Sequence, residues 1–219
     1  MKLLHFFGDR FLCLYNLKHS YIIEIDSFNV KTKRIVLGKQ IHSDKIKIVT
    51  EKQAGSGIIK SSIKGVDGLI TNQKNLFLCI KTADCVPIFL YDPGKEVIAA
   101  LHSGRVGTEY NIVGKALKKM KQRFGCKISN IHAELGPAIC GKNYQVDKKI
   151  FDNFVRKTEV EQTDQNLDLK KVIISNLLEA GISEDNIINH EICTKSNSDY
   201  FSYRENKTTQ RQISIIGMK

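Results

Sequence analysis

Short apolar runs and alternating apolar and polar residues dominate the first third of the chain, and this pattern is typical of β-strands. Strands are predicted at residues 21–30, 45–50, 67–71, 76–80, 128–136, 187–194 and 212–217. Residues 81–108 contain two more apolar strands, joined by a turn at Asp92-Pro93-Gly94. This predicted hairpin carries a cysteine near its start and a histidine near its end.

After Gly107 the apolar spacing changes to about four residues. The residues at this spacing are Ile112, Ala116, Met120 and Phe124. The spacing predicts an amphipathic helix over 108–124, and Gly125 is placed to end it. Two further helices are predicted over 147–157 and 167–180.

Strands and helices are mixed without a strict βαβ alternation, which favours an α/β class of the α+β or layered-sandwich type. The chain has 219 residues, of which 42% are hydrophobic, and this suits one domain covering residues 1–219. We expect its core to form without disulfide or metal staples.

The formal net charge of +11 suggests an anionic partner such as phosphate, a nucleotide, nucleic acid or a membrane surface. The basic residues are dispersed, and the sequence has no Trp and few aromatic residues among them, which argues against a nucleic-acid surface. A basic nucleic-acid-binding module therefore stays an alternative that rests on net charge alone.

The six cysteines lie far apart and form no C-x-x-C pair, so reduced thiols are expected. No apolar run approaches the roughly 18 residues of a membrane span. We expect a cytoplasmic protein without membrane contact, as a monomer or a homodimer.

Three candidate functional residues lie at predicted strand boundaries: His42 in KQIHSDK, Cys85 in TADCVP and His102 in LHSGRVG. Thiolate and imidazole are preferred ligands of Zn²⁺, and three protein ligands leave a fourth position open, as in catalytic sites. The spacing matches no local zinc motif, so two other interpretations stay open. One is a packed thiol with structural histidines, and the other is a Cys85–His102 nucleophile pair with Asp84 as orienting group.

Longer strings extend this picture, in the order KQIHSD, VDGLITN, KTADCVPIFLYD, AALHSGRVGT, ELGPAICGKNYQV and CTKSNSDYFSYRENKTTQRQISII. From about Lys39 to the C-terminus the chain resembles the YfiH-like proteins, also labelled laccase-domain proteins or multicopper polyphenol oxidases. The resemblance implies a layered α/β/β/α sandwich, related to that of bacterial deamidating toxins of the cytotoxic-necrotizing-factor type. It also implies that His42, Cys85 and His102 are the metal ligands.

The same resemblance implies zinc-dependent phosphorolysis of purine nucleosides (adenosine, inosine, methylthioadenosine) with adenosine deaminase activity. Asp84 is then a candidate proton shuttle, with a turn carboxylate as its alternative role. The guanidinium groups of Arg204, Arg105 and Arg211 are candidate phosphate binders, and Gln40 and Ser43 are candidate partners of the base or sugar. Copper suits the same ligands, but a multicopper centre requires roughly ten histidines and the chain has six.

Two strings depart from the family pattern. HSGRVG stands where the family has HAGWRG, so Arg105 and Val106 replace Trp and Arg; TQR, ending at Arg211, stands where the family has TGR. These departures concern substrate range and rate more than metal binding.

A thiol hydrolase based on Cys85 and His102, or a peptidoglycan-precursor editing factor, remains the alternative enzyme, and metal content distinguishes it from the zinc enzyme.

Overall fold

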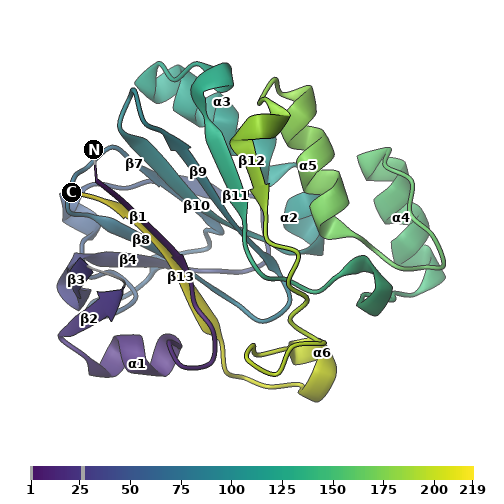
Figure 1. Ribbon diagram of the computed structural model, residues 1–219, viewed down its shortest axis with the longest axis horizontal. Helices are drawn as coiled ribbons and strands as arrows, with labels where there is room; N and C mark the ends of the chain where they lie inside the picture. Colours follow the sequence, from purple (N-terminus) through teal and green to yellow (C-terminus); the bar gives the residue numbers. More distant parts are fainter. Residues whose placement is uncertain (1, 26–27) are drawn as a thin grey trace.

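Two β-sheets stack face to face in the computed structural model of the protein, which describes residues 2–25 and 28–219 (Figure 1). The five-stranded sheet has the order β1 (Leu3–Phe7), β13 (Gln212–Met218), β8 (Phe77–Thr82), β4 (Ile35–Lys39) and β6 (Ile63–Lys64). The six-stranded sheet has the order β12 (Ile187–Asn189), β11 (His132–Leu135), β9 (Val86–Asp92), β10 (Val97–Ser103), β7 (Gly68–Thr71) and β5 (Ile46–Ile48).

The central strands are buried on both faces, which explains why their sequences read as continuous apolar runs rather than as alternating ones. Between the sheets lies an apolar layer that includes Leu78 and Ile80 of β8, Phe89 of β9 and Ala100 of β10. A second cluster lies on the outer face of the six-stranded sheet, and a third on the outer face of the five-stranded sheet.

Helices cover the outer face of the six-stranded sheet (Figure 1). They are α2 (Arg105–Glu109), α3 (Ile112–Phe124), α4 (Lys148–Thr158) and α5 (Leu169–Glu179). The other outer face carries α1 (Leu14–His19) and the hairpin β2 (Ile22–Ile25)–β3 (Phe28–Lys31). The layered α/β/β/α arrangement is therefore confirmed, with the fourth layer made of one short helix and one hairpin.

Short 3-10 turns connect several of these elements, at Thr32–Arg34, Glu51–Gln53, Ile128–Asn130, Gly141–Asn143 and Glu184–Asn186. No helix in the described ranges is long and apolar enough to cross a membrane.

At one end of the sandwich the chain passes repeatedly from one sheet to the other. It does so between β4 and β5, between β6 and β7, between β8 and β9, and between β12 and β13 by way of α6 (Tyr203–Asn206). Loops at strand ends carry exposed side chains on a rigid scaffold, so four loops from distant parts of the sequence can meet at this end.

The predicted helix over 108–124 is wrong in its first turn, because the structure has two helices there. Asn111 separates them with a left-handed backbone (φ 50°), and its Oδ1 accepts a hydrogen bond from Gly114 N at 2.8 Å as the N-cap of α3. The predicted end at Gly125 is confirmed, since this residue adopts φ 68°.

The predicted strand 21–30 is also two elements, β2 and β3, which pair antiparallel; residues 26–27 between them lie outside the described residues. The predicted turn at Asp92-Pro93-Gly94 is confirmed. Asp92 Oδ1 accepts hydrogen bonds from Gly94 N and Lys95 N, both at 3.0 Å. The hairpin register pairs Val86 with Ser103 and Pro87 with His102, which brings the start of one strand beside the end of the other.

Candidate functional site

Three side chains from separate segments meet at the crossover end of the sandwich. His42 follows β4, Cys85 precedes β9 and His102 lies near the end of β10. Their nearest ligand atoms, one per residue, all lie within 4.8 Å of one another. His102 is buried, Cys85 is partly buried and His42 is exposed, so the group has a solvent-accessible side. These three residues can hold one metal ion, in the set that the sequence predicts.

Gly104, which directly follows β10, leaves the space that the side chains of His42, Cys85 and His102 need. A Cβ atom on Gly104 would lie 3.0 Å from Cys85 Sγ and 3.1 Å from His42 Cδ2. Both distances are tighter than ordinary carbon contacts, so any side chain here would push the thiol and the imidazole apart. A Cys/His/His donor set with an open side fits a catalytic Zn²⁺ site.

A buried carboxylate orients two of the three groups. Asp67 Oδ1 lies 2.8 Å from His102 Nδ1 and accepts a hydrogen bond from His42 N at 3.0 Å. Asp67 Oδ2 accepts hydrogen bonds from Ser43 N at 2.8 Å and Ser43 Oγ at 2.6 Å. Burial alone would raise the pKa of Asp67, but the bonds from His102 and Ser43 outweigh it and lower the pKa to about 2. The ionised carboxylate fixes the Nδ1–H tautomer of His102 and leaves Nε2 for a ligand.

Cys85 and His102 favour each other's charged forms. Burial opposes ionisation of the Cys85 thiol, but the positive charge and hydrogen bond of His102, assisted by His42, lower its pKa. Burial likewise disfavours the His102 imidazolium, and the Cys85 thiolate and Asp67 raise its pKa. The thiolate is the form that binds metals and the form that attacks electrophiles. The geometry thus suits both the metal site and the alternative thiol nucleophile.

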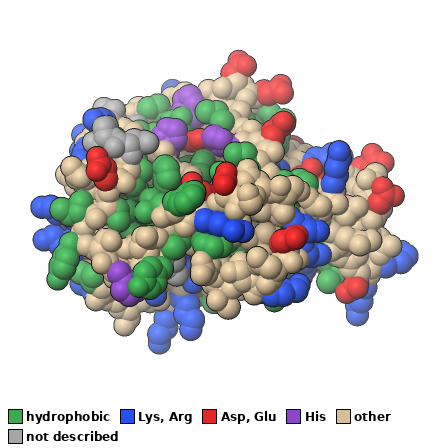
Figure 2. Space-filling model, turned by 60° about the horizontal axis from the view of Figure 1, so that its bottom comes forward, with side chains coloured by type: hydrophobic (Ala, Val, Ile, Leu, Met, Phe, Trp, Pro, Cys, Tyr) green, Lys and Arg blue, Asp and Glu red, His purple; other side chains and the backbone are tan. Residues whose placement is uncertain are grey.

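A pocket of about 580 Å³ opens beside these residues. Its lining includes five cationic side chains, namely Lys81, Arg105, Arg204, Lys207 and Arg211. Asp84 is the one carboxylate among the described lining residues, so the pocket attracts anions. The view in Figure 2 brings the α6 end forward, and basic side chains lie across its centre and right beside a hydrophobic area on its left.

Asp84 holds α6 against the pocket. Its backbone has φ 89°, an uncommon conformation for a residue with a side chain. Its Oδ1 accepts a hydrogen bond from Thr194 Oγ1 at 2.8 Å, and its Oδ2 accepts one from Arg204 N at 2.6 Å in the first turn of α6. These bonds match the predicted turn-carboxylate role, and the proton-shuttle role stays a prediction.

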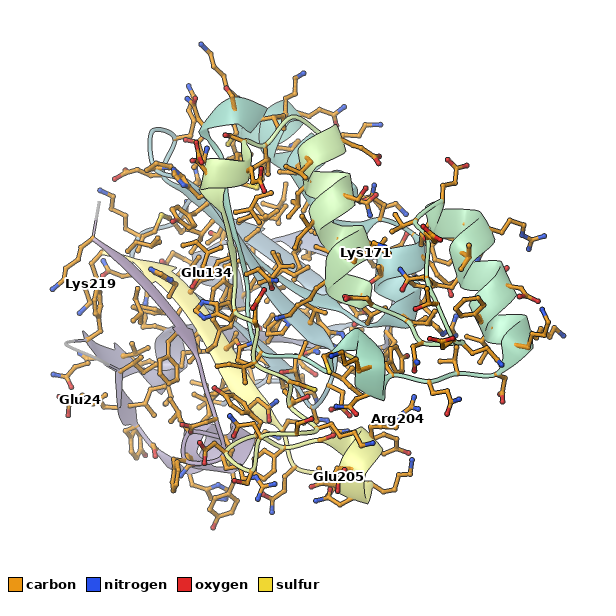
Figure 3. The ribbon with its side chains drawn as sticks, turned by 45° about the vertical axis from the view of Figure 1, so that its right-hand side comes forward. Glu24, Glu134, Lys171, Arg204, Glu205 and Lys219 are labelled. Atoms are coloured by element: carbon orange, nitrogen blue, oxygen red, sulfur yellow. The ribbon has the colours of Figure 1, made fainter. Side chains whose placement is uncertain are left out.

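The three predicted phosphate binders all line the pocket. Arg204 donates from Nη1 to Gln145 O at 2.6 Å, and its guanidinium carbon lies 4.9 Å from the centre of the Tyr144 ring. Figure 3 shows Arg204 on α6, close to the segment that leads into α4. Arg105 forms an ion pair with Glu109, and Arg211 Nη1 donates to backbone carbonyls of its own loop.

The two predicted base or sugar partners have protein partners. The Gln40 side chain exchanges two hydrogen bonds with the backbone of Lys81, at 2.8 and 2.9 Å, and thereby joins the ends of β4 and β8. Gln40 still lines the pocket, whereas the Ser43 hydroxyl is directed to Asp67. Their contacts with substrate stay predictions.

Sequence reasoning missed Asp67, Lys81, Tyr144 and Lys207. Asp67 had a usable signal, because a histidine ligand normally needs a carboxylate or carbonyl partner and VDGLIT places a carboxylate at the start of a strand. Lys81 and Lys207 look like ordinary surface lysines in the sequence. Only the fold shows that they face the same pocket as the candidate metal ligands.

Comparisons with known proteins give matches over most of the chain. A family model described as multi-copper polyphenol oxidoreductase laccase matches residues 18–219. The purine nucleoside phosphorylase YlmD of Bacillus subtilis is 32% identical over 206 residues, which cover 89% of this chain and 74% of the relative. The purine nucleoside phosphorylase Cj1217c of Campylobacter jejuni is 34% identical over 188 residues, covering 85% and 78%.

Solved structures show the same fold. YlmD from Geobacillus stearothermophilus superposes with a TM-score of 0.81 at 27% identity, covering 99% of this chain and 90% of that one. The Bacillus licheniformis protein YfiH gives a TM-score of 0.80 at 32% identity, covering 85% and 75%.

Proposed function

Because the chain belongs to the multi-copper polyphenol oxidoreductase laccase family, and its relatives are named purine nucleoside phosphorylases, we propose that it is a metal-dependent purine nucleoside phosphorylase. One observation carries the proposal: a single pocket combines the His42, Cys85 and His102 group with five cationic side chains. Phosphorolysis needs a site for a phosphate dianion next to a site for the nucleoside, and this pocket offers both kinds of lining.

The family's description does not extend to a multicopper centre in this chain. Such a centre requires roughly ten histidines, and the chain has six. Among the His, Cys, Asp and Glu side chains of the described ranges, one group has metal-binding geometry, namely His42, Cys85 and His102, and its mixed thiolate and imidazole donors suit Zn²⁺. We therefore take zinc as the metal.

The cationic side chains that line the pocket position phosphate for the reaction. Arg204, Arg211 and Lys81 hold the dianion by charge-assisted hydrogen bonds, which are strengthened because the pocket is partly shielded from water. A phosphate oxygen forms a bond to the anomeric carbon of the ribose while the bond from that carbon to the purine nitrogen breaks. The electron pair passes to the purine ring, which takes up the proton that the monohydrogen phosphate dianion gives up, and the products are the free base and ribose-1-phosphate.

The apolar part of the lining receives the nucleoside. It includes Val106, Ile139, Leu169 and the ring of Tyr144. An aromatic ring and branched aliphatic side chains suit the flat faces of a purine. Arg204 lies over Tyr144 and lines the same pocket, so it stands between the apolar part of the lining and the other cationic side chains.

Deamination of adenosine is the second proposed activity, and the observation that favours it is the open side of the three-residue group. His42, Cys85 and His102 would hold the zinc ion, which would supply a Lewis acid for activating water, the chemistry needed to displace ammonia from the purine ring. Asp84, next to Cys85, is the carboxylate in the lining that can hold and transfer a proton.

The test is to incubate the purified protein with inosine or adenosine, with and without phosphate, and to separate the products by chromatography. Phosphate-dependent release of base with an equal amount of ribose-1-phosphate is expected. Release of free ribose, or no turnover of either nucleoside, would contradict phosphorolysis. Inosine formed from adenosine without phosphate would report the deaminase activity.

Metal dependence is tested on the same preparation after chelation and after addition of Zn²⁺ or Cu²⁺. Loss of activity on chelation and recovery with Zn²⁺ are expected. Cys85→Ala should lose both zinc and activity, while Cys126→Ala, which removes a buried thiol packed in the outer core, should keep both. Full activity in the metal-free protein would favour the Cys85–His102 thiol hydrolase instead.

A further inference from the structure

A second thiol group lies outside the metal-binding set, in the two loops that follow β11 and β12. Cys140 N donates a hydrogen bond to Cys193 Sγ at 3.2 Å. The amide of Asn143 donates to both sulfur atoms, at 3.5 Å to Cys140 Sγ and 3.3 Å to Cys193 Sγ. A bridge between Ala138 and Cys193 holds the two loops side by side. Two thiols 53 residues apart in the sequence therefore belong to one hydrogen-bonded cluster.

The two thiols differ in their ionisation. Burial opposes ionisation of Cys193, but hydrogen bonds from Asn143, Cys140 and Ser196 outweigh it and lower its pKa to about 6. Burial and the hydrogen bond to Cys193 raise the pKa of Cys140. One thiolate beside one protonated thiol is the arrangement of a nucleophile with its resolving partner.

The other cysteines lack this arrangement. Cys79 and Cys126 are buried, and burial raises the pKa of each thiol. Cys85 belongs to the candidate metal group, and Cys13 contacts the amide oxygen of Asn16 at the start of α1. Cys140 and Cys193 are both partly exposed, so small oxidants and alkylating reagents can reach them.

We propose that Cys140 and Cys193 form a reversible dithiol–disulfide pair that reacts with hydroperoxides. The Cys193 thiolate attacks one oxygen of the peroxide, the O–O bond breaks, and the other oxygen leaves as an alcohol or water after taking a proton. Cys193 is then a sulfenic acid. Cys140 loses its proton and attacks Cys193 Sγ, the S–S bond forms, the S–O bond breaks and water leaves. Two thiols are oxidised and one peroxide is reduced.

The pair is connected to the substrate pocket through Asp84. Ile139, which precedes Cys140, donates from its backbone N to Asp84 O at 2.9 Å. Thr194, which follows Cys193, donates to the Asp84 carboxylate. A disulfide would therefore join the two segments that hold Asp84 in place.

The experiment treats the 219-residue chain with one equivalent of hydrogen peroxide, blocks remaining thiols with N-ethylmaleimide, and maps peptides by mass spectrometry. We expect two peptides joined by a disulfide between Cys140 and Cys193, which dithiothreitol separates. Cys13 should remain a free thiol and should therefore be alkylated. Cys140→Ser should stop the reaction at a Cys193 sulfenic acid that dimedone traps. A link from Cys85 to either residue, or oxidation of both residues no faster than of Cys13, would overturn the proposal.

A milder variant tests the pair without removing a sulfur. Asn143→Ala removes the amide that donates to both sulfurs, and alkylation of Cys193 at pH 7 should slow about tenfold as its thiolate fraction falls. Asn153→Ala changes a partly exposed asparagine of α4, whose Oδ1 accepts a hydrogen bond from Arg156 and not from a cysteine, and it is the matched control, which should leave the rate unchanged. Equal rates in the two variants would contradict the role of Asn143.

Discussion

The carboxylate of Asp67 lies 2.8 Å from Nδ1 of His102, and this contact fixes which nitrogen of the histidine faces the site. Asp67 also accepts hydrogen bonds from the backbone N of His42 and from Ser43, so it positions two of the three candidate ligands at once. Asp67 is not among the residues that line the pocket, and it acts through the residues that it orients.

We predict that Asp67→Asn lowers zinc affinity by about 10–100-fold, because the amide cannot accept the same set of hydrogen bonds in their present orientation. Competition with a chromophoric chelator measures the affinity. Asp92→Asn is the matched control, since Asp92 is an equally buried carboxylate that holds the distant hairpin turn. That variant should lose stability and keep its zinc affinity. Equal losses of zinc affinity in both variants would mean a general effect on folding.

Gly104→Ala should lower metal binding and activity by about 100-fold, although its backbone angle (φ −82°) accepts alanine without strain. The added methyl group would contact Cys85 Sγ and His42 Cδ2 and separate the ligands. Zinc content after dialysis is the measurement. Gly94→Ala, where the nearest atom is 3.5 Å away in a turn far from the site, should bind zinc normally. Normal zinc content in Gly104→Ala would show that the ligands can shift.

Arg204→Ala should raise the KM for phosphate about 10–100-fold, as expected for loss of a hydrogen-bonding cation. Arg204→Lys keeps the charge but loses the planar contact with Tyr144, so an intermediate effect is expected. Initial rates at varied phosphate give the KM. Arg123→Ala, at the exposed end of α3, serves as the control for a general change in net charge. An unchanged KM in Arg204→Ala would remove this residue from the phosphate site.

Lys81 gives a prediction about pH. Burial lowers its pKa, and the charges of Arg211 and Lys18 add to this effect. Lys81 therefore loses its positive charge at a lower pH than an ordinary lysine, and the KM for phosphate should rise with pH between this lowered pKa and about 10.5. Lys81→Arg stays charged over that range and should show a flatter profile. The same rise in both proteins would assign the pH effect to another group.

The sequence predicts the three candidate ligands better than their surroundings. His42, Cys85 and His102 stand at strand boundaries in recognisable strings, and the hairpin between Cys85 and His102 is local enough to predict its register. The contact of His42 with the hairpin is not local, because it depends on how one sheet stacks on the other. This is also why Lys81 and Lys207 could not be assigned to the pocket beforehand.

Local patterns fail where one residue adopts an unusual backbone conformation. The apolar spacing from Ile112 to Phe124 is correct for α3. It contains no sign that Asn111, with its left-handed backbone conformation, separates α3 from the preceding helix. Asp84 likewise has a positive φ that the string TADCVP does not reveal. The side chain of Asn111 accepts a local hydrogen bond from Gly114, whereas Asp84 depends on a distant partner, Thr194.

The three passages from β4 to β5, from β6 to β7 and from β8 to β9 have a consequence for engineering. Each passage supplies one member of the set His42, Asp67 and Cys85, and each is anchored in both layers of the sandwich. Sliding one layer over the other would displace all three together relative to β10. Substitutions deep between the layers, such as at Phe89 or Ala100, can therefore alter the geometry of the site from a distance.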